Sequence, residues 1–300
     1  MKVLEVENIS KSFGDLKAVD KVTFSIDQGV VFGLIGPNGA GKTTTLRMIM
    51  NIIIPDTGKV TVMENKDIRT ATDMIGYLPE ERGMYRKMKV KNLLRFLMEL
   101  KKVSKKEAVK SIDFWLERVD LSDWKEKKIE ELSKGMQQKI QFIGTVLHNP
   151  KLLILDEPFG GLDPVNQNLI KDILLELKKK GTTIIFSTHV MESAEKLCEE
   201  IFMINKSRKV FDGKLTDIKS NLGKKNLLVI YEGNNNFLES SEIAKYNDYG
   251  NSVEIQLRSD GDAQKVLKQA VSDGTTIRTF EIQEPSLYDI FIDTVGKDNE

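Results

Sequence analysis

Hydrophobic residues in the first two thirds of the chain include several runs with the spacing of strands. Apolar and polar residues alternate from Val22 to Ile26, which is typical of a half-buried strand. Residues 30–35 form a continuous apolar run, as expected of a strand buried on both faces. Similar runs at residues 152–155 and 183–187 predict two more buried strands.

Between these strands the spacing changes to that of helices. After a glycine-rich turn, one helical face is predicted by Leu46, Ile49, Met50 and Ile53. We expect Pro55 to end that helix, and a polar turn at residues 56–58 to lead into a strand through residues 60–62. Residues 87–148 are charge-rich and helical in pattern, and residues 169–177 predict another helix. Strands that alternate with helices favour an α/β fold with a mostly parallel sheet.

The pattern changes again towards the C-terminus. Residues 219–225 are polar and lack periodicity, so we expect a linker there. Beyond it, strands are predicted near residues 227–231, 253–257 and 277–282. The two helices expected with them are one whose apolar face is Ala263, Val266, Leu267, Ala270 and Val271, and one that starts at Ser286, where Ser286 and Asp289 suit a capping box. The chain therefore divides into residues 1–221 and a small α+β domain, residues 222–300.

Composition excludes several classes of protein. The chain has 300 residues, with 45 basic and 45 acidic side chains, and 40% of it is hydrophobic, which argues against a disordered or collagen-like protein. No apolar run approaches the roughly 18 residues that a membrane helix requires, and the N-terminus lacks the apolar core of a signal peptide. A single cysteine, Cys198, favours a reducing, cytosolic location.

The balanced total charge hides an asymmetry between the two domains. Residues 1–221 carry a net charge of +6 and residues 222–300 a net charge of −6. The basic excess is too small and too mixed with acids to indicate nucleic-acid binding.

Residues 36–43, Gly-Pro-Asn-Gly-Ala-Gly-Lys-Thr, match the phosphate-binding loop G-x-x-x-x-G-K-[ST] between a predicted strand and helix. The glycines let backbone N–H groups converge on phosphate oxygens, and the helix N-terminus adds its positive end. Lys42 is expected to reach the β- and γ-phosphates, and the Thr43 hydroxyl to ligate Mg²⁺. We predict nucleotide contacts from Gly36, Pro37, Asn38, Gly39, Ala40, Gly41, Lys42, Thr43 and Thr44.

The apolar strand at residues 152–155 ends in two carboxylates, Asp156 and Glu157. Paired acids at the end of a buried strand need a cation or a proton nearby. Asp156 is therefore predicted to hold Mg²⁺, directly or through water, and Glu157 to polarise an attacking water. Together with the phosphate loop, the pair predicts a P-loop ATPase or GTPase.

Further motifs follow in a fixed order. Leu-Ser-Lys-Gly-Met-Gln-Gln at residues 132–138 opens a helix before the acidic pair; Gly-Leu-Asp at 161–163 and Ser-Thr-His at 187–189 follow it, and Phe13 precedes the phosphate loop. With this set, residues 1 to about 220 resemble the ATP-binding subunits of ABC transporters. The resemblance implies a P-loop domain with a mostly parallel sheet, an antiparallel β subdomain and a helical subdomain at about residues 87–148.

The resemblance also implies roles for single residues. Phe13 matches the aromatic residue that stacks on adenine, and His189 matches the histidine that senses the γ-phosphate and orients the water. Ser133 and Gly135 match the signature loop, which in this family contacts the γ-phosphate held by the other subunit. Asp163 matches the loop that communicates across the dimer.

Two departures from the family pattern narrow the resemblance. Lys134 and Met136 replace the middle glycine and the glutamine of the usual Leu-Ser-Gly-Gly-Gln signature. Glu80 occupies a loop position where the family usually has glutamine, and its carboxylate can ligate Mg²⁺. Both departures, and the C-terminal tail at residues 285–291, resemble the sodium-efflux and drug-efflux branch of the family.

The leading hypothesis is an ATPase that uses ATP and Mg²⁺ to power export through a separate membrane-spanning permease subunit. The resemblance implies a dimer with a second ATP-binding subunit, the same chain or a paralogue, at the cytoplasmic side of the cell membrane. One alternative is a soluble ABC-type ATPase acting on ribosomes or DNA. It is disfavoured because only 91 residues separate Lys42 from Ser133 and one ATPase unit is present. Another is a nucleotide-binding regulator without turnover, disfavoured by the presence of Glu157 and His189.

Overall fold

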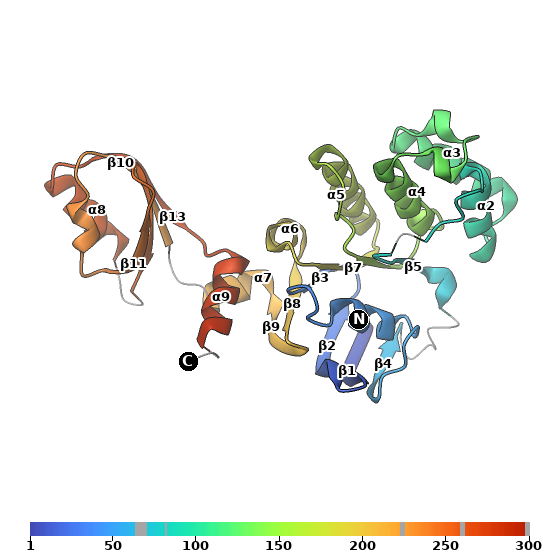
Figure 1. Ribbon diagram of the computed structural model, residues 1–300, viewed down its shortest axis with the longest axis horizontal. Helices are drawn as coiled ribbons and strands as arrows, with labels where there is room; N and C mark the ends of the chain where they lie inside the picture. The colour runs from blue at the N-terminus through green and yellow to red at the C-terminus, as the bar shows by residue number, and fades with distance from the viewer. Residues whose placement is uncertain (64–70, 82, 223–225, 259–261, 298–300) are drawn as a thin grey trace. The chain divides into compact units, whose positions relative to one another are not determined.

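The computed structural model describes residues 1–63, 71–81, 83–222, 226–258 and 262–297. The chain forms two compact units, Met1–Lys214 and Leu215–Glu300, and each is described here by itself (Figure 1). The division falls before the boundary that the sequence suggested at residue 221. Lys219 to Leu222, expected in a linker, instead complete helix α7 (Leu215–Leu222), and residues 223–225 lie outside the described ranges.

Two sheets build the first unit. A three-stranded antiparallel sheet has the order β2-β1-β4, and a six-stranded sheet has the order β5-β6-β7-β3-β8-β9. The strands of the first sheet are β1 (Lys2–Phe13), β2 (Leu16–Asp27) and β4 (Thr57–Val62). Those of the second are β3 (Val31–Ile35), β5 (Ile75–Leu78), β6 (Leu152–Asp156), β7 (Thr183–Thr188), β8 (Glu200–Asn205) and β9 (Arg208–Lys214). All neighbours in the larger sheet are parallel except β8 and β9. The predicted, mostly parallel sheet and antiparallel subdomain are therefore confirmed.

The central strands β3, β6 and β7 are buried along their whole length, as their continuous apolar runs predicted. One hydrophobic core joins the antiparallel sheet to one face of the larger sheet, with Leu46, Met48 and Ile49 of α1 (Lys42–Ile49) between them. On the other face of the sheet lie α4 (Lys134–Val146) and α5 (Pro164–Lys179), as Figure 1 shows.

Helix α1 is shorter than its apolar pattern suggested. It ends at Ile49, with Met50 as its C-cap, so the expectation that Pro55 ends it is wrong. The chain leaves the helix through Asn51, whose φ of 53° lies in the left-handed region. Asparagine adopts that conformation more readily than most residues with a side chain, which explains the early end.

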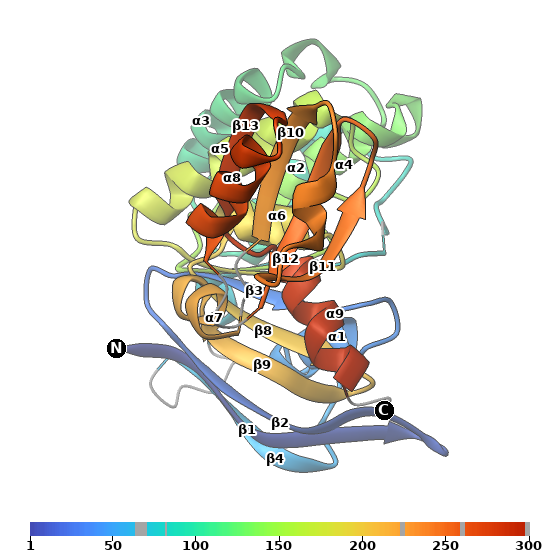
Figure 2. The same cartoon turned by 90° about the vertical axis from the view of Figure 1, so that its left-hand side faces the viewer.

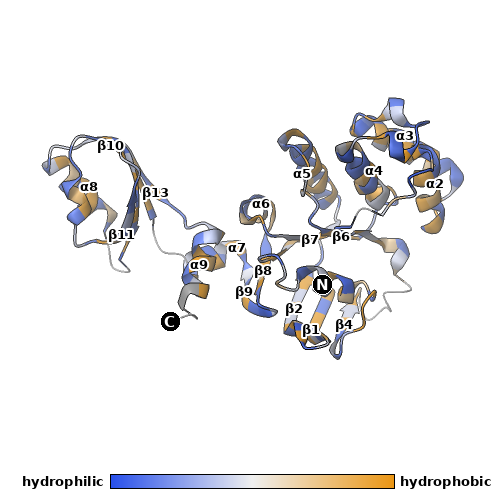
Figure 3. Ribbon diagram, in the orientation of Figure 1, coloured by the Kyte–Doolittle hydropathy of each residue, from blue (hydrophilic) through white to orange (hydrophobic). Residues whose placement is uncertain are grey.

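The predicted helical subdomain consists of α2 (Val90–Leu100), α3 (Lys105–Arg118) and α4, with the short 3₁₀ turns η2 (Ser122–Trp124) and η3 (Ile129–Glu131) between α3 and α4. Each helix carries hydrophobic and hydrophilic sides (Figure 3). On α2, Leu93 and Leu94 are buried, whereas Leu100 at its end is 60% exposed. The remaining short elements of this unit are η1 (Thr72–Met74) and α6 (Met191–Leu197).

The second unit is a four-stranded antiparallel sheet of order β11-β12-β10-β13 with helix α8 (Ala263–Ser272) across one face (Figure 2). The strands are β10 (Asn226–Glu232), β11 (Ile243–Asp248), β12 (Ser252–Leu257) and β13 (Thr276–Gln283), and η4 (Asn236–Glu239) joins their core. Strand β11 had no counterpart in the sequence prediction. Val271, expected on the apolar face of α8, is 62% exposed.

The last helix, α9 (Leu287–Lys297), has the predicted capping box. The N–H of Asp289 donates to Ser286 Oγ at 3.1 Å, and the N–H of Ser286 donates to Asp289 Oδ2 at 3.3 Å. Reciprocal bonds of this kind satisfy N–H groups that a helix start leaves open. Among the described residues, no helix combines the length and the apolar character needed to cross a membrane.

Candidate functional site

The phosphate-binding loop lies between β3 and α1, as predicted. Lys42 at the start of α1 is buried, and its Nζ donates to the carbonyl oxygens of Gly36 at 2.8 Å and Pro37 at 3.1 Å. A Cβ atom at Gly36 would lie 2.1 Å from the carbonyl oxygen of Ile204. Gly41 has a φ of 110°, which residues with a side chain rarely adopt. These two glycines are therefore required by the shape and packing of the loop.

The acidic pair ends β6 next to a buried serine of β7. Ser187 is paired in register with Asp156, its hydroxyl donates to Asp156 Oδ1, and the N–H of Glu157 donates to Ser187 Oγ at 3.1 Å. Ser187 and Asp156 are 0% and 1% exposed. Glu157 has a φ of 49°. The serine thus fixes both acids at once, a role that the sequence analysis did not assign to it.

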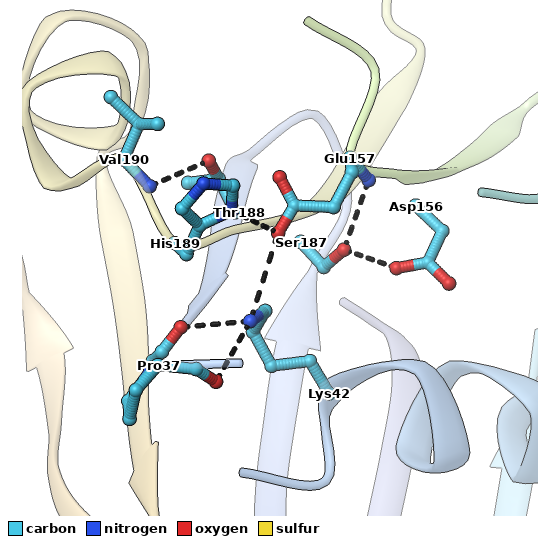
Figure 4. Close-up of polar contacts among 9 residues, drawn as sticks. Pro37, Lys42, Asp156, Glu157, Ser187, Thr188, His189 and Val190 are labelled. Atoms are coloured by element: carbon cyan, nitrogen blue, oxygen red, sulfur yellow. Dashed lines mark hydrogen bonds and ion pairs between the residues drawn. The ribbon is translucent and has the colours of Figure 1, made fainter. Parts of the chain in front are cut away.

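Three functional side chains meet at one carboxylate oxygen. Glu157 Oε1 lies 2.9 Å from His189 Nδ1 and 3.6 Å from Lys42 Nζ (Figure 4). Burial lowers the pKa of Lys42, and the negative charge of Glu157 opposes that shift. The residues that the sequence named as lysine anchor, general base and switch histidine are therefore brought together.

A cavity of about 320 Å³ opens beside this cluster. Its lining residues are Asn38, Leu78, Pro79, Glu80, Gln138, Gln141, Asp156, Glu157, Gly160 and His189. Gln138 is 5% exposed, and its Nε2 donates to the carbonyl oxygens of Pro158 at 3.2 Å and Gly160 at 3.0 Å. Its Oε1 is buried without a hydrogen-bond partner. Gln138 belongs to the signature stretch, but the sequence analysis gave it no role.

The oxygen atoms around the cavity fit a Mg²⁺ ion. Asp156 Oδ2 is buried and has no hydrogen-bond partner, which is costly for a carboxylate unless a cation or water reaches it. Glu80 lines the same cavity, and Thr43 follows Lys42 in the first turn of α1. Hydroxyl and carboxylate oxygens are the ligands that Mg²⁺ prefers.

The other predicted site residues do not line this cavity. Ser133 caps α4, and its Oγ accepts from the N–H of Met136 at 3.3 Å, with Gly135 in the first turn. Asp163 caps α5 by accepting from the N–H of Asn166 at 3.0 Å. Phe13 ends β1, is 49% exposed, and has Lys11 Nζ 5.8 Å from its ring centre. Phe13, Ser133 and Asp163 are exposed, and Gly135 is half-buried.

The loop that carries Glu80 lies between two cavities. A second, more apolar cavity of about 270 Å³ is lined by Tyr77, Met84 and Tyr85 and by Leu93 and Leu97 of α2, among others. Pro79 and Gln141 line both cavities. Glu80 could instead pair with Arg82 of the same loop, but Arg82 lies outside the described residues.

Sequence comparison decides the family. A family model described as ABC transporter matches residues 19–160, and one described as ATP-binding protein DrrA1-3-like, C-terminal domain, matches residues 213–295. The uncharacterized ABC transporter ATP-binding protein YhaQ of Bacillus subtilis is 46% identical over 98% of this chain and 99% of its own length. The chain belongs to the ABC transporter ATP-binding proteins. ABC ATP-binding domains hydrolyse ATP, so the chain is an ATPase subunit.

Further matches agree with that assignment. The Nod factor export ATP-binding protein I of Rhizobium etli is 33% identical over all of this chain and 95% of its own length. A solved structure titled "Structure of ATP binding subunit of ABC transporter" matches with a TM-score of 0.68 and 30% identity, covering 73% of this chain and 92% of that chain. The ABC ATPase fold inferred from the motifs is confirmed, and the ribosome- or DNA-acting alternative is not favoured.

Proposed function

We propose that this ABC ATPase subunit powers export through a separate membrane-spanning permease subunit, at the cytoplasmic side of the cell membrane. Export is supported by the Nod factor export ATP-binding protein I of Rhizobium etli, which is similar over the whole chain. The single observation that carries the catalytic part is the placement of Glu157 Oε1 next to both Lys42 and His189. The permease would select the cargo.

ATP would lie with its phosphates on the loop at residues 36–44 and its adenine on Phe13. Lys42, which now binds loop carbonyls, would turn its ammonium to the β- and γ-phosphates. Thr43, Asp156 and Glu80 would hold Mg²⁺, which supplies charge neutralisation on the phosphate oxygens when bound. Ser187 keeps Asp156 in place through its hydroxyl.

Glu157 would act as general base. A water that attacks the γ-phosphorus gives its proton to Glu157, the bond to the β-phosphate oxygen breaks, and ADP and phosphate are the products. His189, 2.9 Å from the Glu157 carboxylate, would orient that water and contact the γ-phosphate. Because His189 is within hydrogen-bond distance of Glu157, it can hold the general base and the attacking water in one geometry.

A second ATP-binding subunit, identical or paralogous, would complete each site. Ser133 and Gly135 lie at the N-terminus of α4, where N–H groups and the helix dipole favour an anion. They do not line the cavity of their own chain, which agrees with the role that the family resemblance implies, contact with the γ-phosphate bound by the partner. Asp163 would form the contact between the two sites.

The shared site can be tested with mixed dimers. Ser133→Arg and Lys42→Ala damage different halves of the site, so a mixed dimer contains one site with both lesions and one with neither. We expect the mixture to recover ATPase activity above either variant alone. If tagged, verified mixed dimers recover none, the site is completed within one chain.

The transport assignment needs the membrane partner. The tagged chain should be isolated from membranes with a membrane-spanning protein in fixed ratio, and the complex in lipid vesicles should hydrolyse ATP faster than the free chain. The Lys42→Ala complex serves as control, because it should keep the partner and lose hydrolysis. Isolation of the chain with ribosomes instead would contradict the assignment.

A further inference from the structure

The hairpin between β8 and β9 turns at two residues with unusual backbone angles. Lys206 has a φ of 44° and Ser207 a φ of 69°. This left-handed region is strained for residues with a Cβ atom, and two-residue hairpin turns of this kind favour Asn-Gly or similar pairs. A strained turn persists only where the surrounding structure stabilises it, so the contacts of Lys206 and Ser207 indicate the role of this turn.

Ser207 forms three hydrogen bonds to other segments. Its N–H donates to the carbonyl oxygen of Ala40 at 3.2 Å, and its own carbonyl oxygen accepts from the N–H of Asp20 at 2.8 Å. Its hydroxyl donates to the carbonyl oxygen of Lys17 at 2.5 Å. Ser207 is therefore hydrogen-bonded through its backbone to the phosphate loop and β2, and through its side chain to β2.

The position of Lys17 makes this contact relevant to ATP. Lys17 is paired with Ser12, and Leu16 with Phe13, at the tip of the β1–β2 hairpin. The hydroxyl of Ser207 thus binds the start of β2, which is paired with the end of β1 that carries Phe13. Figures 1 and 2 both place the β8–β9 hairpin beside β2.

Charged and packing contacts support the same junction. Asp20 is 9% exposed and binds Lys17 Nζ at 2.6 Å and Arg208 Nε at 2.8 Å. The Lys17 ammonium holds the pKa of Asp20 below its ordinary value, and the Arg208 guanidinium lowers that pKa further by a smaller amount. A Cβ atom on Gly41 would lie 2.3 Å from the carbonyl oxygen of Ala18, so the phosphate loop is packed directly on β2.

We propose that Ser207 is a positioning residue that fixes the Phe13 hairpin against the phosphate loop, so that the adenine and the triphosphate of ATP are bound by one rigid surface. The inference rests on the proposed assignment of Phe13 to adenine. Ser207 itself touches neither the phosphates nor the reacting atoms. Its side chain acts on the adenine end, because the bond to Ala40 comes from the backbone and survives substitution of the side chain.

Ser207→Ala tests the binding of the adenine end and of the phosphate end of the nucleotide separately. Its binding of ATP and of inorganic tripolyphosphate, both with Mg²⁺, is compared with that of the unaltered chain by calorimetry. The loss of one hydrogen bond predicts a three- to tenfold weaker affinity for ATP, at about the usual value of such a bond. Affinity for tripolyphosphate should change less than twofold. Ser111→Ala is the matched control, because its hydroxyl also donates to a carbonyl, that of Leu147 at 3.0 Å, away from the site.

Phe13→Ala and Ser207→Gly distinguish the possible failures. If Phe13→Ala weakens the binding of ATP more than that of tripolyphosphate and Ser207→Ala shows no such difference, the positioning role is refuted and the adenine assignment stands. If Phe13→Ala weakens both ligands equally, the adenine assignment fails and the inference falls with it. Ser207→Gly relaxes the turn and lacks the hydroxyl, so it should repeat the ATP-selective loss with a higher melting temperature than Ser207→Ala. Wild-type ATP affinity in Ser207→Gly would instead assign the effect to strain and overturn the proposal.

Discussion

Ser187→Ala tests how the acidic pair is held. The substitution removes the hydroxyl that donates to Asp156 Oδ1 and accepts from the N–H of Glu157. Ser187 is 0% exposed, so solvent does not readily replace its hydroxyl in either bond. A buried group left unsatisfied costs about 1–3 kcal/mol, and a bond to a charged group lies at the upper end.

From these contacts we expect a loss of about 3 kcal/mol in the stability of the first unit, allowing for non-additivity of the two bonds. In a unit of this size that corresponds to a melting temperature lower by roughly 6–12 °C. We also expect kcat at saturating ATP to fall by about 10- to 100-fold, the usual effect of removing a group that orients a metal-binding carboxylate.

Thr183→Val separates stability from catalysis. Thr183 lies at the opposite end of β7, is fully buried, and accepts from the N–H of Gly29 at 2.9 Å. Its loss should lower stability by about 1–2 kcal/mol and leave kcat within twofold of the unaltered chain. Calorimetric melting and steady-state ATPase assays at 25 °C measure both effects. A kcat for Ser187→Ala that matches Thr183→Val would show that Ser187 only stabilises the fold.

Two further predictions concern single side chains around the Glu80 loop. Glu80→Gln should weaken the apparent Mg²⁺ affinity in the ATPase assay and leave nucleotide affinity without Mg²⁺ unchanged, because the substitution removes a full negative charge from the cavity. Glu81→Gln is the control, since Glu81 is exposed and pairs with Arg47. Identical Mg²⁺ titrations for Glu80→Gln and the unaltered chain would show that Glu80 is not a ligand of the metal. Burial lowers the pKa of His148 to about 4. As pH falls, the imidazole of His148 is therefore protonated in the unfolded chain before it is protonated in the folded chain. The contribution of His148 to stability is lost as pH falls from about 6.5 towards 4. Urea unfolding at pH 7 and pH 5 should therefore show a smaller loss of stability on acidification for His148→Gln than for the unaltered chain, and equal losses would contradict a neutral, buried His148.

The parts of the site that could be predicted from sequence are those encoded by local patterns. The phosphate loop follows a short buried strand, and the acidic pair ends another, so neighbouring residues alone define them. Ser187 was visible within a motif, but its role depends on the register that pairs it with Asp156 across two strands. Gln138 was missed for the same reason, because its amide binds carbonyl oxygens 20 and 22 residues further along the chain.

The fold differences also have local causes. Strand β11 buries Ile243 alone among its six residues, so an edge strand of this kind has no alternating pattern to detect. The end of α1 depends on the backbone angle of Asn51 rather than on Pro55. The linker prediction relied on the polar composition of residues 219–225, but short polar segments also form exposed helices such as α7, of which Ile218 is the buried residue.

The measurement that tests the central claim most directly is ATP binding and turnover by Glu157→Gln. The glutamine keeps the shape of the side chain near Lys42 and His189 and cannot accept the proton of the attacking water. We predict turnover reduced at least about 100-fold, within the usual contribution of a general base, with ATP affinity unchanged or tighter and a dimer in light scattering at saturating ATP. Turnover within threefold of the unaltered chain would contradict the assignment of Glu157 as the catalytic base.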